Sequence, residues 1–206
     1  MFTAEEQSTL TPGKVIEILR KGNDEFVNNQ LTVKNTTERV RSAVEGQYPA
    51  AVVLSCLDSR VPVEDIFHCG IGDIFVARVA GNVVNPDILG SMEYACKLSG
   101  AKLAVVMGHG YCRTVMLAID GVELGNITGL LNKIKPAVNQ SNATFMGEAK
   151  STNPEFVDTV CRANIKLMVT EIRKSSLILR EMEENGEIGI VGAMYDMHNG
   201  KVEFFV

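Results

Sequence analysis

Three short apolar runs, rich in β-branched residues, constrain the fold of this chain more than any other feature. They are AAVVLSC (50–56), DIFVARV (73–79) and KLAVVMG (102–108). Polar residues do not alternate with apolar ones along these runs, which is typical of strands buried on both faces in a parallel sheet. Between the second and third runs, NPDILGSMEYACKLSG predicts a helix that Asp87 caps and Gly100 ends. This part of the chain therefore predicts a strand, a helix and a parallel strand in succession.

The rest of the sequence predicts further helices and one more pair of strands. One helix is expected after Thr11-Pro12, and a short one within 31–49. Further helices are expected near 112–120, near 126–138, and from Pro154 to about Glu184. After Asn185-Gly186, a strand over 187–196 and the turn HNG lead into an antiparallel edge strand over 201–206. Alternating strands and helices favour an α/β fold, with a mostly parallel central sheet of four parallel strands plus an antiparallel edge strand, flanked by helices.

Length and composition favour one domain and exclude some classes of partner. The 206 residues, 46% of them hydrophobic, suffice for a single domain over residues 1–206. Within it we expect an N-terminal helical arm over 1–48 and an α/β core over 49–206. A net charge of −5 without a block of Lys and Arg argues against a nucleic-acid partner. The five cysteines are scattered, which favours reduced thiols or metal ligands over a disulfide framework.

The sequence carries no pattern of a secretory leader or a membrane span. Residues 1–12 contain acids instead of a basic and apolar leader, and no apolar run approaches roughly 18 residues. We therefore expect no membrane association and a cytoplasmic protein, or a periplasmic one if a leader has been removed.

Three candidate metal ligands lie where two of the predicted strands end. Cys56 closes the first strand, His109 follows the third, and Cys112 lies one helical turn beyond His109. In an open parallel sheet, functional sites gather beyond the carboxyl ends of the strands, so these side chains can meet. Two thiolates and one imidazole suit Zn2+ and leave a fourth position for water or substrate, which is typical of a catalytic site. A His and a Cys that only pack near a strand end are the alternative.

Asp58 and Arg60 follow Cys56 closely enough to lie near such a metal. A bidentate Arg60 fork can keep Asp58 ionised and leave a lone pair for a proton from zinc-bound water, although a plain loop salt bridge is the ordinary interpretation. A phosphatase is excluded, because CLDSR has the wrong Cys-to-Arg spacing and no Gly-rich phosphate loop. His68 and Cys69 suggest a second metal site, but adjacent side chains commonly diverge, and we favour structural roles for both.

Five motifs give the sequence a close resemblance to the β-class carbonic anhydrases, which runs from the GQYP loop to the C-terminal strand. The motifs are CLDSR (56–60), GDIFVARVAGNVV (72–84), HxxC (109–112), DGVELGNITGLLNKIKPAV (120–138) and GAMYD (192–196). The combination of CxDSR with HxxC at this separation is specific. The resemblance implies reversible hydration of CO2 to bicarbonate by a zinc-bound hydroxide.

The resemblance also assigns residues to roles. It implies one Zn2+ per subunit, held by Cys56, His109 and Cys112, and a dyad of Asp58 and Arg60 that orients and deprotonates the zinc-bound water.

For the substrate pocket, the resemblance implies that Gln47 hydrogen-bonds the substrate. Phe75, Ala80 and Tyr94 fall where the family has pocket-lining residues, some of which reach across a subunit boundary. The family further implies a homodimer, or a homotetramer of paired dimers, with the N-terminal helix lying over the partner.

One stretch departs from the family pattern, GH(S/T)xCG(A/G). Gly110 replaces the hydroxyl residue, and Arg113-Thr114 replace the small pair. Three interpretations stay open: Arg113 points away, Arg113 places a cation beside the zinc, or the changes retarget the site with Tyr111 reshaping its mouth. Because of this stretch, one alternative to a CO2 hydratase is a catalytically weakened homologue that binds zinc or bicarbonate. Another is a COS or CS2 hydrolase on the same scaffold, since these molecules resemble CO2 in shape.

Overall fold

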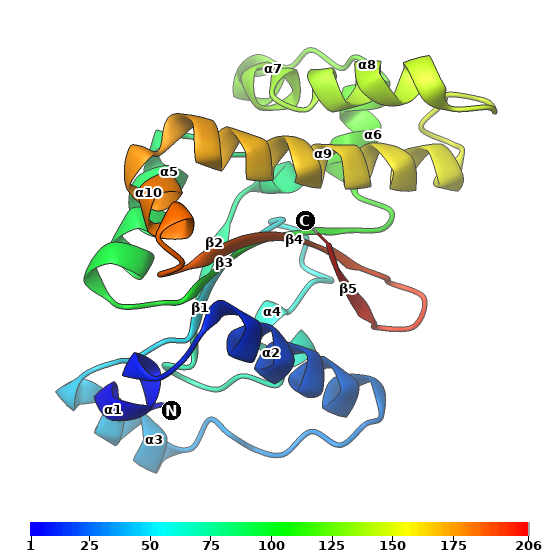
Figure 1. Ribbon diagram of the computed structural model, residues 1–206. Coiled ribbons are helices and arrows are strands. Elements are labelled where there is room, and N and C mark those ends of the chain that lie inside the picture. The colour runs from blue at the N-terminus through cyan, green and yellow to red at the C-terminus, as the bar shows by residue number, and fades with distance from the viewer. Residues whose placement is uncertain (206) are drawn as a thin grey trace.

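The computed structural model describes residues 1–205, and within them five strands form one sheet in the order β2-β1-β3-β4-β5 (Figure 1). Strands β1 to β4 run parallel to one another, and β5 pairs antiparallel with β4 at the edge. This confirms the predicted α/β fold class; Val206, the last residue of the predicted edge strand, lies outside the described residues. The strands are β1 (Ala51–Ser55), β2 (Ile74–Arg78), β3 (Leu103–His109), β4 (Gly189–Tyr195) and β5 (Val202–Phe205).

Helices cover both faces of the sheet (Figure 1). The N-terminal helices lie on one face, α9 lies across the other, and α7 and α8 lie outside α9. No helix within residues 1–205 is long and apolar enough to cross a membrane. The helices are α1 (Ala4–Ser8), α2 (Pro12–Val27), α3 (Thr37–Ser42), α4 (Val63–Ile66), α5 (Pro86–Glu93), α6 (Arg113–Ile119), α7 (Gly125–Asn132), α8 (Lys135–Thr144), α9 (Pro154–Ser175) and α10 (Leu177–Glu184).

The central strands are buried on both sides, which explains why their sequences lack polar alternation. In β1, Leu54 packs into the core under α9, whereas Val53 packs into the core under α2. In β3, Val106 packs into the core under α9, and Val105 packs into the core under α2. Successive side chains of a strand point to opposite faces, so a strand covered by helices on both faces is apolar throughout.

Helix α2 begins where the sequence predicts, with the Thr11 hydroxyl accepting a hydrogen bond from the Lys14 amide at 3.3 Å. Its apolar face, including Val15 and Leu19, is buried against the sheet of its own chain. The chain itself therefore supplies the surface on which this helix lies, and the position of the helix over a partner stays a prediction. The preceding helix α1 was not predicted; Thr3 caps it in a five-residue turn too short for a periodic signal.

Helix α5 begins two residues earlier than predicted. Asn85, not Asp87, is the capping residue, and its Oδ1 accepts a hydrogen bond from the Ile88 amide at 2.9 Å. Pro86 then takes the first helical position, where its fixed φ and missing N–H are favourable, and Asp87 falls within the first turn. The helix continues into a π-helical turn and stops at Gly100, whose φ of +81° confirms the predicted end.

The amphipathic segment predicted from Pro154 to Glu184 is two helices, divided at Ser176. Ser176 is 1% exposed, and its hydroxyl donates to Glu93 at 2.6 Å while accepting from the Leu179 amide at 3.2 Å. The serine thereby caps α10 and ties it to α5. The predicted helix over 126–138 is likewise divided, into α7 and α8. Apolar residues recur at helical spacing on both sides of each break, so the periodicity alone does not show where one helix ends and the next begins.

Candidate metal centre

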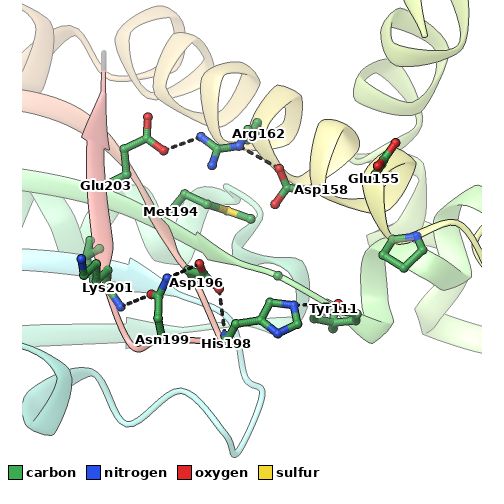
Figure 2. Close-up of a pocket in the computed structure, with 13 residues that line it drawn as sticks. Tyr111, Glu155, Asp158, Arg162, Met194, Asp196, His198, Asn199, Lys201 and Glu203 are labelled. Carbon is green, nitrogen blue, oxygen red and sulfur yellow. Dashed lines mark hydrogen bonds and ion pairs between the residues drawn. The ribbon is translucent and has the colours of Figure 1, made fainter. Parts of the chain in front are cut away.

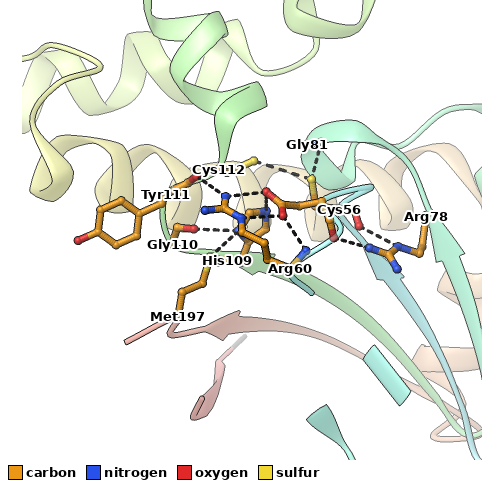
Figure 3. A network of polar contacts seen from close by, with 10 residues as sticks. Cys56, Arg60, Arg78, Gly81, His109, Gly110, Tyr111, Cys112 and Met197 are labelled. Carbon is orange, nitrogen blue, oxygen red and sulfur yellow. Dashed lines mark hydrogen bonds and ion pairs between the residues drawn. The ribbon is translucent and has the colours of Figure 1, made fainter. Parts of the chain in front are cut away.

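The carboxyl ends of β1 and β3 bring three potential metal ligands together (Figure 3). Cys56 follows β1 directly, His109 is the last residue of β3, and Cys112 precedes α6. One ligand atom from each residue lies within 4.8 Å of the other two, and the two sulfurs are 3.9 Å apart. All three residues are at most 2% exposed. The predicted convergence of these side chains is therefore present.

The hydrogen bonds of His109 leave one ring nitrogen free. Nδ1 lies 2.8 Å from the Gly110 carbonyl oxygen, and because a carbonyl can only accept, Nδ1 is the donor. Nε2 of the neutral ring then carries a lone pair, and it has no hydrogen-bond partner among residues 1–205 although it is buried. A buried nitrogen lone pair beside two thiols fits a metal ion, and the bond from Nδ1 orients the ring for it.

The two thiols act as a proton-sharing pair. A hydrogen bond from Cys112 lowers the pKa of the Cys56 thiol, and the same shared proton raises the pKa of Cys112. The Gly81 amide also donates to the Cys56 sulfur, at 3.3 Å. A metal ion that binds here must displace the shared proton, so metal affinity depends on pH.

Asp58 and Arg60 form a bidentate pair beside the three ligands. Arg60 donates to the two carboxylate oxygens at 2.9 and 2.7 Å, and its backbone amide donates at 3.0 Å. The guanidinium lowers the pKa of Asp58 to about 2. One oxygen of Asp58 lies 3.8 Å from Nε2 of His109, so the carboxylate faces the position that a metal would take. Arg60 also donates to the Tyr111 carbonyl at 3.2 Å, which joins the two loops that carry the ligands.

Two residues that sequence reasoning did not assign also hold this centre. Arg78, the last residue of β2, donates through Nε to the Cys56 carbonyl at 3.1 Å and through its guanidinium to the Asp58 carbonyl. Gly81 supplies the amide that reaches the Cys56 sulfur. Arg78 ends β2, the strand next to β1, and Gly81 follows it. Because sites gather beyond the carboxyl ends of parallel strands, this position in the sequence could have indicated that both residues lie near the ligands.

Comparisons with known proteins agree with this geometry. A family model described as carbonic anhydrase matches residues 51–202. A carbonic anhydrase of Mycolicibacterium smegmatis is 33% identical over 187 residues, which cover 90% of this chain and 89% of the relative. Carbonic anhydrase 2 of Mycobacterium tuberculosis is 31% identical over 189 residues, covering 89% and 87%. A solved β-carbonic anhydrase of Aspergillus fumigatus has a TM-score of 0.72 at 27% identity, covering 82% of this chain and 80% of that one.

The chain belongs to the β-class carbonic anhydrase family. A tetrameric member from Sordaria macrospora shares its fold, with a TM-score of 0.71 at 24% identity and coverage of 80% and 84%. The residues matched by the family model include all three ligands, Asp58 and Arg60, whereas Gln47 precedes the matched range.

The residues expected to line the substrate pocket of a β-carbonic anhydrase do not gather around these ligands within one chain. Phe75 and Tyr94 pack edge to face, with ring centroids 6.1 Å apart, and line a shallow surface cavity beside β2. Ala80 lies next to Gly81 in the turn that follows β2. Gln47 is exposed and precedes the amino end of β1, whereas the ligands lie beyond the carboxyl ends. A single chain therefore does not place Gln47 at its own metal centre.

The stretch that departs from the family pattern is only partly in contact with the centre. A Cβ on Gly110 would meet nothing within 4 Å in the described part of the chain, so no steric reason requires glycine there. Arg113 is exposed in the first turn of α6, and its side chain makes no hydrogen bond or ion pair with residues 1–205, which favours the interpretation that it points away. Thr114 instead packs toward Gly81.

Tyr111, which lies between His109 and Cys112 in the sequence, lines a cavity of about 710 Å³ (Figure 2). Its hydroxyl lies 2.8 Å from Nε2 of His198, in the exposed turn before β5. Farther along the wall, Arg162 pairs with Asp158 and Glu203, each at 2.8 Å (Figure 2). Most of the residues that line this cavity are charged or polar, and none of the three ligands lines it.

His68 and Cys69 have separate protein partners. His68 Nδ1 lies 2.5 Å from a carboxylate oxygen of Glu25, and its Nε2 accepts from the Thr32 amide at 3.0 Å. The Cys69 thiol donates to the Phe67 carbonyl at 3.4 Å, and burial raises its pKa to about 12. These contacts support the structural interpretation of both residues.

Proposed function

We propose that this chain is a zinc-dependent carbonic anhydrase that catalyses the reversible hydration of CO2 to bicarbonate. The observation that carries the proposal is the buried His109 nitrogen lone pair beside the sulfurs of Cys56 and Cys112, in a member of the β-class family. Two sulfurs and one imidazole nitrogen are a donor set for Zn2+, and three protein ligands leave one position for water or substrate. When bound, zinc supplies Lewis-acid activation of water near neutral pH.

In this proposal Asp58 orients the reacting water. Its bidentate bond with Arg60 fixes the carboxylate, and its pKa of about 2 keeps it ionised, so it is a permanent hydrogen-bond acceptor. A carboxylate with so low a pKa is a weak base near neutral pH. We therefore assign Asp58 to orientation, with the proton passing on to solvent or buffer.

Hydrogen bonds to the His109 ring and to the backbone of the loop after β1 keep the proposed ligands in place for this chemistry. The Gly110 carbonyl holds the His109 ring by Nδ1, and Arg78 holds the loop that carries Cys56 and Asp58. Such partners of metal ligands commonly contribute 10- to 100-fold in metal affinity or activity.

The substrate pocket requires a second copy of the chain in this proposal. Gln47, which would hydrogen-bond an oxygen of CO2, comes from the amino end of β1 and so would serve the partner's centre. Two apolar side chains of the π-helical turn after α5 are exposed, Tyr94 at 51% and Leu98 at 77%, and Tyr94 lines the cavity beside the edge strand β2; these exposed side chains support an interface there. The fold relative from Sordaria macrospora is tetrameric. We accordingly propose a homodimer, or a tetramer built from two of them.

The experiment that tests the activity is stopped-flow CO2 hydration on protein of measured zinc content. We expect zinc-dependent turnover in the parent protein, and loss of both zinc and turnover in Cys56→Ala. A second variant combines Gly110→Thr with Arg113→Gly and leaves Thr114 in contact with Gly81. Full zinc occupancy without turnover in the parent, rescued in this variant, would mean that the unusual stretch has blocked or redirected the site. A higher kcat/KM for COS or CS2 than for CO2 would replace the proposed substrate.

A further inference from the structure

Helix α9 carries a buried polar side chain that the proposed reaction does not use. Asn164 is 1% exposed and lies among apolar core residues such as Val160, Ile165 and Met168. Its Nδ2 donates to the Gly81 carbonyl at 3.0 Å, while its Oδ1 has no hydrogen-bond partner in residues 1–205. A buried amide with an unsatisfied atom destabilises a fold relative to a well-packed apolar side chain. Its one hydrogen bond is therefore the feature to explain.

That hydrogen bond holds a residue whose conformation is already tightly restricted. Gly81 has a φ of +69°, in the left-handed region that favours glycine. A Cβ there would lie 2.7 Å from Ile134 Cδ1 and 3.1 Å from Thr114 Cγ2. Thr114, one of the unusual residues beside the ligand motif, thus forms part of the wall around Gly81. The apolar walls restrict where Gly81 lies, and Asn164 fixes the direction of its carbonyl.

The amide of the same glycine points at a proposed metal ligand. The Gly81 N–H donates to the Cys56 sulfur at 3.3 Å (Figure 3). The turn that carries it is closed by the Asn82 amide, which donates to the Val79 carbonyl at 3.0 Å. One residue therefore receives a hydrogen bond from α9 at its carbonyl and gives one to the metal centre at its amide.

We propose that Asn164 is a positioning residue, which anchors Gly81 so that its amide hydrogen-bonds the Cys56 sulfur and limits how strongly that sulfur donates to the metal. The inference rests on the proposed zinc site. Hydrogen bonds to a metal-bound sulfur withdraw electron density from it, and such bonds tune the metal in sulfur-ligated centres. Two thiolate ligands reduce the Lewis acidity of zinc, and an amide on one of them restores part of it.

Cobalt(II) substitution tests this role without measuring activity. Asn164→Leu removes the donor and keeps a buried side chain of similar size. Without the anchor we expect the charge-transfer absorption from sulfur to cobalt to move to lower energy, because a sulfur that accepts no hydrogen bond is a stronger electron donor to the metal. The matched control is Val169→Ala, which alters the same buried face of α9 and removes no polar atom. It should leave the charge-transfer band unchanged even where it lowers stability.

A second measurement detects the hydrogen bond from the Gly81 amide to the Cys56 sulfur directly. In the parent protein loaded with an NMR-active cadmium isotope, we expect scalar coupling between the cadmium and the Gly81 amide proton, transmitted through the Cys56 sulfur. Asn164→Leu should weaken or abolish this coupling. If that variant does not fold, Asn164→Ala removes the same donor with a smaller side chain.

The outcomes separate the two proposals. An unchanged absorption band and unchanged coupling in a folded Asn164 variant would refute the role of Asn164 and leave the metal site intact. A parent protein that fails to bind zinc, cobalt or cadmium stoichiometrically would refute the proposed metal site, and the role of Asn164 with it.

Discussion

At the scale of single residues, the charge of Asp58 follows from its partners. Hydrogen bonds from Arg60 lower its pKa to about 2, so Asp58 is ionised throughout the neutral pH range. Asp58→Asn keeps the shape but loses the charge, and we expect kcat/KM for CO2 hydration to fall about 100-fold with zinc content unchanged. The exposed Asp65→Asn is the control. Stopped-flow kinetics on zinc-quantified protein check this, and full activity in Asp58→Asn would show that the carboxylate has no part in the reaction.

Because the folded-state pKa of Asp58 lies so far below neutrality, its titration cannot shape the activity profile near pH 7. Any inflection in kcat/KM there belongs to another group, and we expect it to persist in Asp58→Asn at the reduced rate. Disappearance of the inflection in this variant would contradict the assignment of Asp58 as a permanently ionised acceptor.

Two glycines near the centre should respond differently to the same substitution. Gly81→Ala places a Cβ 2.7 Å from Ile134 at a φ of +69°, and we expect it to lower the free energy of unfolding by about 1–3 kcal/mol. Gly110→Ala meets nothing within 4 Å among the described residues, so its effect should stay within about 0.5 kcal/mol. Urea unfolding of both variants checks the difference, and equal effects would show that the cage around Gly81 is less rigid than its contacts indicate.

At the scale of elements, Ser176 determines where α9 ends and α10 begins. Ser176→Ala removes the cap on the Leu179 amide and the donor to Glu93, and we expect a loss of about 1–2 kcal/mol of stability. Ser175→Ala is the matched control, because Ser175 is exposed and does not cap α10. Denaturant midpoints with unchanged m-values would measure both. A Ser176→Ala midpoint equal to that of the control would show that packing alone sets the break.

The contact between α2 and the segment after α4 should make stability depend on pH. A hydrogen bond from His68 lowers the pKa of Glu25 in the folded protein below its ordinary value of 4.5. The stabilisation from ionised Glu25 is therefore fully present above pH 4.5 and is lost as the pH falls through the lower folded-state value. Glu25→Gln should be less stable than the parent above this range, with the difference shrinking in acid. Glu17→Gln, at a 70% exposed position of the same helix, should show no such trend.

At the scale of the whole molecule, the sequence is most informative where a physical rule joins distant segments. The apolar strand runs predict the parallel sheet because both faces of β1 and β3 are covered. Parallel strands share one polarity, and this alone brings Cys56 and His109 to the same edge. The ligand cluster therefore follows from the sequence alone, as does the pair of Asp58 and Arg60, whose partners are two positions apart.

The sequence does not predict contacts that lie outside the helical and strand periodicities and join residues far apart in the chain. The hydrogen bond from Asn164 to Gly81 spans 83 positions, and its only sequence signal is a polar residue on the apolar stripe of a helix. Asn85 and Asp87 are both good capping residues, and Pro86 between them decides which one caps. The break at Ser176 depends on Glu93, a residue of a different helix.

The direction of β1 also limits how a complete substrate pocket can form. Gln47 precedes the amino end of the strand and Cys56 follows its carboxyl end, and the five strand residues alone span about 17 Å. If Gln47 contacts the substrate, it must therefore do so at the centre of a second copy. A symmetric dimer would then contain two sites, each with Asp58 from one chain and Gln47 from the other.

Mixed dimers test this arrangement directly. Chains carrying Gln47→Ala and chains carrying Asp58→Ala should each be nearly inactive alone. Co-expressed with two different affinity tags and purified through both, they form dimers in which one of the two sites is complete, so we expect about half of the parent activity. Dimers of Gln47→Ala with a chain bearing both substitutions have no complete site if Gln47 acts in trans, and serve as the control. Activity of the first mixture no higher than that of the control would show that Gln47 does not complete the partner's site.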